Sequence, residues 1–388
     1  MNATDRLGVV GYYDLHPNPG LNFTLNRLAR TIPSEKIKAV AARIDSLDSW
    51  IKELRSAGAQ AEAEGRLAEA ARYLQGAEFY MKLGDPDKAE VYQHSIELMN
   101  RALPDMAAAR DSVPYQTGSL PVIRLPAVGE ERDVILIHSG FDGLVEEMYP
   151  MLEPFAAAGF SVLAFEGPGQ GAALRTSHLH MPYDWEKPVS AILDHYGIES
   201  CTLIGMSLGG YLAPRAAAFE KRIRRLVAWG AMFDFFEAYR KRLGTARFKV
   251  LSALLDMKLA GVVNQLINKA RLKDDILDWA VSHGMHVSGT KSPFEFLQWV
   301  RTLNLRDCAH MIDQDVLLIM GTEDHLVPTN QVYVQAEAMT GARSVTTAMF
   351  SSRDHAAQHC QVGNTELVIS QILDWLELLA ARDTPAIS

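Results

Sequence analysis

Apolar residues recur at intervals of three and four positions through the first quarter of the chain. One such series is Ile44, Leu47, Ile51 and Leu54, within a stretch rich in Ala, Glu, Lys and Leu. This spacing follows one face of an α-helix, so residues 21–112 are predicted to be helical. Within them, residues 65–103 have the pattern of two antiparallel helices broken at Gly84-Asp85-Pro86. The interpretation is a helical appendage, with an interaction module built on one tetratricopeptide-like hairpin as the alternative.

The pattern changes after Pro114, where short apolar and β-branched runs begin to alternate with helical stretches. The six candidate strands are 134–138, 161–165, 201–205, 225–229, 316–320 and 345–350. Strands buried on both faces of a parallel sheet need unbroken apolar runs of this kind. The alternation therefore predicts an α/β protein with a doubly wound, mostly parallel sheet.

This alternation stops between residues 232 and 310, which are helical in pattern. We predict that residues 232–310 are an inserted helical cap between core strands 6 and 7, which are the candidate strands at 225–229 and 316–320. Residues 1–115 are predicted to be an N-terminal helical segment that forms the other part of this cap. The remaining residues, 116–231 and 311–388, then form the core, whose ligand site is expected at the carboxyl ends of the strands.

Composition excludes several classes of function. The 388 residues carry a formal net charge of −9 and no basic block, so a nucleic-acid partner is not expected. No apolar run reaches the roughly 18 residues of a membrane span, and no apolar core of signal-peptide length follows residues 1–6. Cys201, Cys308 and Cys360 are too widely spaced to predict a metal site or a disulfide framework. We expect a cytoplasmic protein with reduced cysteines and no membrane association.

The segment Gly205-Met206-Ser207-Leu208-Gly209 lies between an apolar strand and a helix start. A serine hydroxyl becomes an effective nucleophile when a sharp strand-to-helix turn holds it near a base, and flanking glycines leave room for that turn. Ser207 is therefore the predicted nucleophile, against the alternative of an ordinary loop serine. The N–H of Leu208 is predicted to face the developing oxyanion.

The loop Ser139-Gly140-Phe141-Asp142-Gly143 follows the first core strand and is predicted to supply the second oxyanion donor. Phe141 is preferred and Gly140 is the next candidate, while Asp142 is either a pocket residue or a turn residue. The next strand ends in Glu166-Gly167-Pro168-Gly169-Gln170-Gly171, which lacks the spacing of a phosphate-binding loop. It is predicted to be a structural turn.

The acid and the base are expected after the last two strands, because triads in this kind of sheet run Ser, acid, His along the chain. In Gly321-Thr322-Glu323-Asp324, Asp324 is preferred over Glu323 as the acid. Two histidines compete for the role of base, and His359 is preferred over His355. His138 and His325 also lie at strand ends, and each is interpreted as a structural histidine.

With these segments placed, the chain resembles the α/β-hydrolases related to 2,6-dihydroxypseudooxynicotine hydrolase and the fungal hydrolases that shorten polyketide chains. The resemblance rests on G-x-S-x-G-G, E-G-P-G-Q-G, G-T-E-D, W-E-K-P-V and the distinctive H-C-Q-V-G-N that contains His359. It implies a two-part helical cap over a buried site. It also implies hydrolysis of a carbon–carbon bond beside a ketone, or of a related ester or thioester. Asp234 and Glu237 are the nearby candidates for an auxiliary acid, without a firm alignment.

The function expected from these features is that of a serine hydrolase acting on a bulky ketone, ester or thioester through an acyl-enzyme. No metal or organic cofactor is required for this chemistry. An acyltransferase or a lactonase with the same triad is an alternative, and a ligand-binding protein on a hydrolase scaffold is another. The natural substrate stays open, and so does the oligomeric state, for which a homodimer is the candidate.

Overall fold

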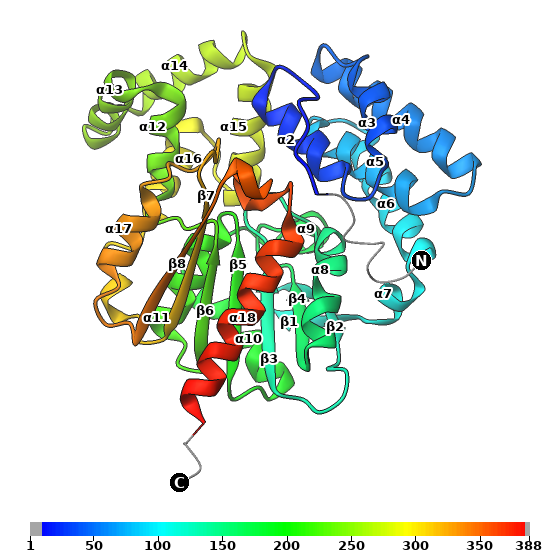
Figure 1. Cartoon of the computed structure of the whole chain (residues 1–388). Coiled ribbons are helices and arrows are strands. Elements are labelled where there is room, and N and C mark those ends of the chain that lie inside the picture. The colour runs from blue at the N-terminus through cyan, green and yellow to red at the C-terminus, as the bar shows by residue number, and fades with distance from the viewer. Residues whose placement is uncertain (1–9, 385–388) are drawn as a thin grey trace. The chain divides into compact units, whose positions relative to one another are not determined.

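The computed structural model describes residues 10–384, which fall into two compact units (Figure 1). The helical unit comprises Met1–Arg110 and Leu243–Val300, and the sheet unit comprises Asp111–Arg242 and Arg301–Ser388. The prediction that the chain has no leader segment rests on residues 1–6, which lie outside the described residues.

The first stretch of the helical unit contains α2 to α7. Their bounds are α2 (Pro19–Leu28), α3 (Ser34–Ala41), α4 (Leu47–Ala63), α5 (Leu67–Tyr80), α6 (Lys88–Ala102) and α7 (Pro104–Ala108). The predicted break at residues 84–86 lies between α5 and α6. Trp50 of α4 is fully buried, and its indole N–H donates to the Gly76 carbonyl of α5 at 2.7 Å. A side chain at Gly76 would lie 2.9 Å from Leu28, so glycine allows α2 and α5 to pack closely.

The second stretch contains α13 (Thr245–Asp256), α14 (Ala260–Arg271), α15 (Asp275–Ser288) and α16 (Pro293–Thr302). Trp279 of α15 joins this stretch to the first one. Its indole N–H donates to the Phe79 carbonyl at 2.6 Å, and its ring centroid lies 4.6 Å from that of Phe79 and 4.7 Å from that of Tyr80. Aromatic contacts of this geometry stabilise beyond simple area burial. Two segments distant in sequence therefore share one helical unit.

Within residues 10–384 the sheet unit has one sheet of eight strands, in the order β1-β2-β4-β3-β5-β6-β7-β8. Their bounds are β1 (Arg110–Tyr115), β2 (Gly118–Leu125), β3 (Asp133–His138), β4 (Phe160–Phe165), β5 (Cys201–Met206), β6 (Ile223–Trp229), β7 (Asp315–Gly321) and β8 (Ser344–Phe350). Strands β3 to β8 run parallel, and β2 pairs antiparallel with β4. The predicted doubly wound, mostly parallel α/β sheet is confirmed.

Strands β1 and β2 were not among the six predicted strands, which correspond to β3 to β8. Residues 110–112 were predicted to be helical, and the structure places them in β1. β1 lies at the sheet edge, carries Pro114 and is largely solvent-accessible, so it lacks the unbroken apolar run that marks a buried parallel strand. In the sheet, β1 pairs with β2 as its neighbour.

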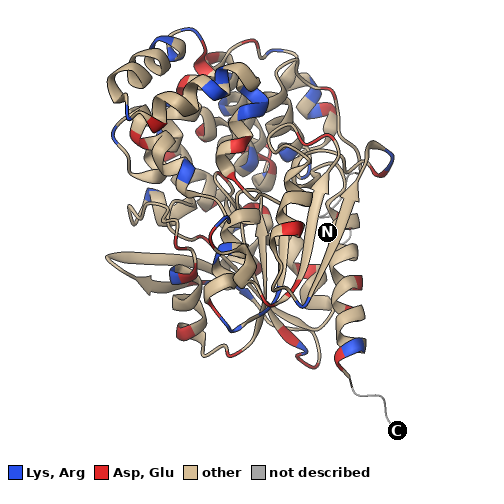
Figure 2. Ribbon diagram, turned by 90° about the vertical axis from the view of Figure 1, so that its left-hand side faces the viewer, with Lys and Arg blue, Asp and Glu red and all other residues tan. Residues whose placement is uncertain are grey.

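Helices cover both faces of the sheet (Figure 1). Those that follow strands are α8 (Val145–Ala157), α9 (Gly171–Arg175), α10 (Glu186–Tyr196), α11 (Gly209–Phe219), α17 (Gln331–Ala338) and α18 (Thr365–Asp383). Lys and Arg positions occur beside Asp and Glu positions along the ribbon (Figure 2). None of the helices within residues 10–384 is long and apolar enough to cross a membrane.

The strand order reverses at β3, whose neighbours are β4 on one side and β5 on the other. The chain runs from β3 to β4 and then crosses back to β5. Loops that leave the carboxyl ends of two such strands diverge to opposite faces of the sheet and leave a crevice between them. The loops after β3 and β5, which carry residues 139–143 and Ser207, therefore flank the expected ligand site.

The helical insertion leaves the sheet unit after β6 and returns before β7, and its two ends are joined. Phe235 N–H donates to the Leu303 carbonyl at 3.0 Å, and Leu305 N–H donates to the Phe233 carbonyl at 2.9 Å. Asp234 pairs with Asn304 in the bridge between these segments. A short α12 (Ala238–Leu243) follows the outgoing segment.

We expect Leu317→Ala in β7 to lower the free energy of unfolding by about 2–5 kcal/mol, because Leu317 is fully buried between the layers. Urea denaturation followed by circular dichroism measures this loss. Thr347→Ala on the exposed part of β8 is the matched control and should cost less than about 1 kcal/mol. Equal losses in the two variants would contradict the burial of β7 between its helical layers.

Candidate active site

Ser207 lies in the tight turn between β5 and α11 with a φ of 59°, in the left-handed region of backbone conformation. Its N–H donates to the Trp229 carbonyl at 2.9 Å, and its carbonyl accepts from Gly210 N–H at 2.8 Å. A Cβ at Gly205 would lie 2.2 Å from the Gly209 carbonyl oxygen, and one at Gly210 would lie 2.0 Å from the Gly230 carbonyl oxygen. These glycines are required because backbone passes directly over backbone at both positions.

Ser207, His359 and Asp324 form a continuous chain of hydrogen bonds. The Ser207 hydroxyl donates to His359 Nε2 at 2.8 Å, and His359 Nδ1–H donates to Asp324 Oδ2 at 2.6 Å. The other carboxylate oxygen of Asp324 accepts from the N–H groups of Leu326 and Val327, both at 2.8 Å. His359 and Asp324 are buried. This arrangement holds the imidazole with Nε2 free to accept the serine proton.

The segment His359-Cys360-Gln361-Val362-Gly363-Asn364 shapes the loop that carries the imidazole. Cys360 and Gln361 have φ values of 50° and 49°, which turn the chain sharply after His359. The Gln361 side-chain oxygen accepts from the buried Trp229 indole N–H at 2.7 Å and so ties this loop to the end of β6. Asn364 caps the first turn of α18 through Leu367 N–H.

Burial and the neighbouring groups have opposite effects on the pKa values of His359 and Asp324. Burial disfavours the charged form of His359, but the Asp324 carboxylate outweighs burial and holds the pKa of His359 well above its usual value. Burial likewise opposes ionisation of Asp324, but the charge and hydrogen bond of His359 and two backbone N–H groups lower its pKa. His325 lies close by, and burial together with the charge of His359 lowers its pKa to about 4. His325 is therefore neutral at physiological pH.

The structure separates the competing candidates from this chain of hydrogen bonds. His355 is exposed at the end of a short 3-10 helix, and Glu323 is exposed beside Gln358. Asp234 is buried, but it accepts from Phe236 N–H and pairs with Arg306 at the base of the insertion. Glu237 pairs with Arg240 on the following turn.

The loop after β3 meets the nucleophile turn. A Cβ built on Gly140 would lie 2.4 Å from the Leu208 nitrogen and 2.9 Å from the Ser207 Cβ. Leu208 is the N-cap residue of α11, where backbone N–H groups favour negative charge. The ring of Phe141 packs against that of Phe235, with centroids 5.8 Å apart, and Asp142 is half-buried in the turn before α8. The two predicted sources of oxyanion donors therefore lie in contact.

Sequence reasoning did not predict what holds this loop. The buried side chain of Gln170 donates to the carbonyls of Ser139 and Gly140, at 2.7 and 2.8 Å. His138 is fully buried, and burial lowers its pKa to about 4. Its Nε2 accepts from the Trp185 indole N–H, so its Nδ1–H donates to the Ser139 carbonyl. The sequence signal for this contact was Gln170 itself, a polar residue within a glycine-rich turn.

The same turn contains Glu166, which is buried and accepts from Val145 N–H at 2.9 Å and from Ala172 N–H. Burial and the neighbouring Glu146 raise the pKa of Glu166 to about 7. A Cβ at Gly171 would overlap the Glu166 carboxylate, and one at Gly167 would overlap the Trp185 ring. The glycines of residues 166–171 therefore make space for buried side chains, in agreement with a structural turn.

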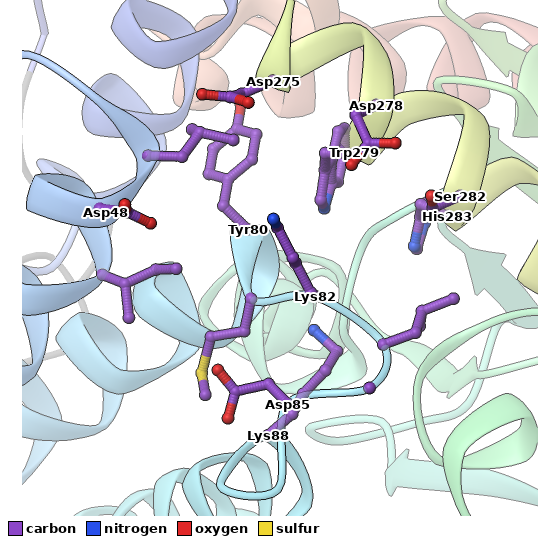
Figure 3. A pocket seen from close by; sticks show the side chains of 15 residues that line it. Asp48, Tyr80, Lys82, Asp85, Lys88, Asp275, Asp278, Trp279, Ser282 and His283 are labelled. Atoms are coloured by element: carbon purple, nitrogen blue, oxygen red, sulfur yellow. The ribbon is translucent and has the colours of Figure 1, made fainter. Parts of the chain in front are cut away.

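A separate cavity of about 450 Å³ lies within the helical unit (Figure 3). Tyr80 and Trp279 form its aromatic wall, and Asp48, Asp275 and Lys82 point into it from α4, α15 and the turn after α5. None of its lining residues belongs to the chain of hydrogen bonds at Ser207. Within residues 10–384 no cluster of His, Cys, Asp and Glu is suited to hold a metal ion, and all three cysteines are unpaired and buried.

Comparison with known proteins identifies the family. Residues 133–358, more than half of the chain, match the family described as the alpha/beta hydrolase fold. The protein belongs to this family. The sheet order, the turn at Ser207 after β5 and the positions of Asp324 and His359 after β7 and β8 follow the plan of these α/β-hydrolases.

Curated relatives are fungal hydrolases. The chain is 30% identical over 277 residues to the hydrolase acrC of Aspergillus aculeatus, a match that covers 63% of this chain and 64% of that relative. It is 28% identical to the 20-hydroxy-prefusarin hydrolase FUS2 of Gibberella moniliformis, over 74% of this chain and 77% of that protein. The match to acrC thus spans less than two-thirds of its length.

Solved structures show the same fold. The 2,6-dihydroxy-pseudo-oxynicotine hydrolase superposes with a TM-score of 0.63 at 19% identity, over 94% of this chain and 98% of that one. AbyA5 superposes with a TM-score of 0.67 at 20% identity, over 93% and 95% of the two chains. The predicted resemblance to fungal hydrolases and to the oxynicotine hydrolase is confirmed.

The raised pKa of His359 predicts how reactivity depends on pH. If His359 is the base for Ser207, as the sequence predicts, only its neutral form activates the hydroxyl, so labelling by a fluorophosphonate should be lost as the pH falls through the pKa of His359. We expect the midpoint to lie above about 6.5, the ordinary pKa of histidine, because Asp324 stabilises the imidazolium. Labelling rates measured from pH 5 to 9 give this midpoint.

Glu323→Gln is the matched control for this pH profile. Glu323 is the exposed neighbour of Asp324, so its neutralisation should leave the midpoint unchanged. Asp324→Asn should slow the reaction on the order of 10⁴-fold, because the imidazole loses its orienting partner. A midpoint below 6.5, or a larger effect at Glu323 than at Asp324, would contradict the assignment of the acid.

Proposed function

We propose that the protein is a serine hydrolase that cleaves carbonyl compounds through an acyl-enzyme on Ser207. The observation that carries this proposal is the unbroken chain from Ser207 through His359 to Asp324, with bonds of 2.8 and 2.6 Å. In this assignment Ser207 is the nucleophile, His359 the general base and acid, and Asp324 the residue that orients and stabilises the imidazolium.

In the first half of the reaction, His359 Nε2 takes the Ser207 proton as Oγ attacks the carbonyl carbon. The carbonyl electron pair moves to oxygen, where the N–H of Leu208 and that of Phe141 or Gly140 bind it. Collapse restores the carbonyl and breaks the bond to the leaving group, which takes the proton from His359. Water then attacks the acyl-enzyme with His359 as base, and the acid is released. Neither a metal nor an organic cofactor takes part.

The proposed substrate is a bulky ketone, ester or thioester, with a β-diketone of polyketide type as the favoured case. The names of two similar proteins, which refer to 20-hydroxy-prefusarin and 2,6-dihydroxy-pseudo-oxynicotine, support a small-molecule substrate with a large organic framework. In carbon–carbon cleavage the leaving group is an enolate, and protonated His359 supplies the proton that it needs. An ester or thioester uses the same proton transfer to oxygen or sulfur.

We also propose that the helical unit is the cap of the active site. Support comes from the path of the chain, since both ends of the insertion are joined at the carboxyl end of β6. Ligands bind at that edge in sheets of this kind. Exclusion of water by such a cap would strengthen the electrostatics at the oxyanion and select bulky substrates. A cytoplasmic location and a homodimer complete this proposal.

The alternatives share the same residues. A lactonase would cleave a cyclic ester, and an acyltransferase would pass the acyl group to an alcohol or amine in place of water. A non-catalytic ligand-binding protein is disfavoured by the intact hydrogen-bond chain, because a binding site does not require a serine hydroxyl oriented by a buried His–Asp pair.

A fluorophosphonate probe tests the nucleophile and the base. We expect wild-type protein to be labelled and Ser207→Ala to be unlabelled, because the probe forms its covalent bond with the activated serine. His359→Ala should slow labelling by at least 10³-fold. His355→Ala is the matched control and should change the rate less than threefold. Labelling of folded Ser207→Ala, or a stronger effect at His355, would overturn the assignment.

A substrate series tests the proposed chemistry. We expect kcat/KM for aryl β-diketones and bulky aryl esters to exceed that for p-nitrophenyl acetate by at least tenfold. The reason is that burial of large apolar groups in a capped apolar site is favourable in free energy. Mass spectrometry of the products separates the cases: an acid plus a ketone reports carbon–carbon cleavage, and a new ester in added alcohol reports acyl transfer. The highest kcat/KM for p-nitrophenyl acetate would contradict a selective hydrolase.

A further inference from the structure

The side chain of Gln170 makes three hydrogen bonds to backbone, two to the loop after β3 and one within its own turn. Its Nε2 donates both hydrogens, one to the Ser139 carbonyl at 2.7 Å and one to the Gly140 carbonyl at 2.8 Å. Its Oε1 accepts from Gly167 N–H at 2.8 Å, which fixes the orientation of the amide. The residue is only 1% exposed, so water does not compete for these bonds.

Peptide geometry turns these two carbonyl contacts into control of two N–H groups. The Ser139 carbonyl belongs to the same planar peptide as the N–H of Gly140, and the Gly140 carbonyl belongs to that of Phe141. Every peptide bond within residues 10–384 is trans, so each N–H points opposite to its carbonyl. A side chain that holds both carbonyls therefore directs the N–H groups of Gly140 and Phe141 away from itself.

Other contacts hold the same loop from its two ends. At its start, the Ser139 carbonyl also accepts from His138 Nδ1–H at 2.8 Å, so both of its lone pairs are occupied. At its end, Glu166 accepts from Val145 N–H at 2.9 Å. Between these two ends, Gln170 holds the peptide of Gly140 and Phe141 through the Gly140 carbonyl. Gly140 itself lies against the Leu208 nitrogen and Ser207.

We propose that Gln170 is a positioning residue of the oxyanion hole, which acts by orienting the N–H groups of Gly140 and Phe141. This inference rests on the proposed function of Ser207 as the nucleophile. Gln170 does not bind the substrate; it fixes the peptide planes that do. An amide suits this task because it donates twice and accepts once and carries no charge that burial would penalise.

Loss of Gln170 should therefore weaken stabilisation of the transition state while it changes the affinity for substrate little. Loss of one oxyanion donor costs about 10²–10³-fold in kcat, and a misdirected donor costs part of that. We therefore expect Gln170→Met, which keeps the shape and removes all three bonds, to lower kcat by about 10–100-fold with KM within twofold. Gln170→Glu keeps the shape but cannot donate when ionised, and it should lower kcat by a similar factor.

The test compares kcat, KM and the inhibition constant of an aryl trifluoromethyl ketone, which forms a tetrahedral oxyanion on a catalytic serine. For a positioning role, the inhibition constant should rise by the same factor as kcat falls. Gln314→Met is the matched control: Gln314 is buried and donates to the Ala217 carbonyl at 2.8 Å, next to the amino end of β7. It should lower the melting temperature with kcat and the inhibition constant within twofold.

Three results would overturn the proposal: an unchanged kcat in folded Gln170→Met and Gln170→Glu, an equal loss of kcat in Gln314→Met, or an equal change in KM and in the inhibition constant. Fluorophosphonate labelling of Ser207→Ala separates this failure from failure of the proposed function. If labelling depends on Ser207 while the Gln170 variants keep full kcat, only the role of Gln170 is wrong.

Discussion

Ser207 adopts a left-handed backbone conformation, with a φ of 59°, because two pairs of backbone segments pass within contact distance around it. Gly205 lies under the carbonyl of Gly209, and Gly210 lies under the carbonyl of Gly230. A non-glycine residue at a positive φ costs free energy, so the surrounding structure must determine this turn. The sheet supplies that constraint, since β5 is buried between β3 and β6 and the Ser207 N–H is bonded to the end of β6. His359 and the loop after β3 are both arranged around this fixed hydroxyl.

Buried glutamine amides join segments of the sheet unit that are distant in sequence. Gln361 holds the indole of Trp229, and Gln335 donates to the Gly210 carbonyl. Gln331 accepts from the N–H groups of Phe233 and Asp234, and Gln170 holds the loop after β3. All four glutamines are buried. An unpaired charge buried in the same places would cost far more free energy than a hydrogen-bonded amide does. Amides give the same geometric control with little electrostatic perturbation.

Sequence reasoning identified the features that are encoded locally. Unbroken apolar runs marked β3 to β8, and the glycine spacing around Ser207 marked the turn. The order of nucleophile, acid and base along the chain pointed to Asp324 and His359, which the structure brings within hydrogen-bond distance of each other and of Ser207. β1 was missed because an edge strand with a proline takes its structure from its neighbour.

Features that depend on partners distant in the chain were not predictable from one sequence. The contact of Gln170 with the Ser139 and Gly140 carbonyls joins positions about 30 residues apart. Asp234 was a candidate auxiliary acid, yet its partner is Arg306, which lies 72 residues away. This ion pair joins Asp234 to the segment that precedes β7. Side-chain chemistry determines which groups a residue can bond to, but the fold determines which of these groups lies within reach.

The joined ends of the insertion have an evolutionary consequence. Because Phe233 and Leu305 are already hydrogen-bonded to each other, the chain between them closes a loop whose ends the sheet unit fixes. The entropy cost of such a loop grows only with the logarithm of its length, about 0.6 kcal/mol for each doubling. Changes in the length of the chain between these two points therefore add little loop-closure entropy cost to the sheet unit. The length and sequence of this segment can therefore vary while the strands that carry Ser207, Asp324 and His359 keep their order in the sheet.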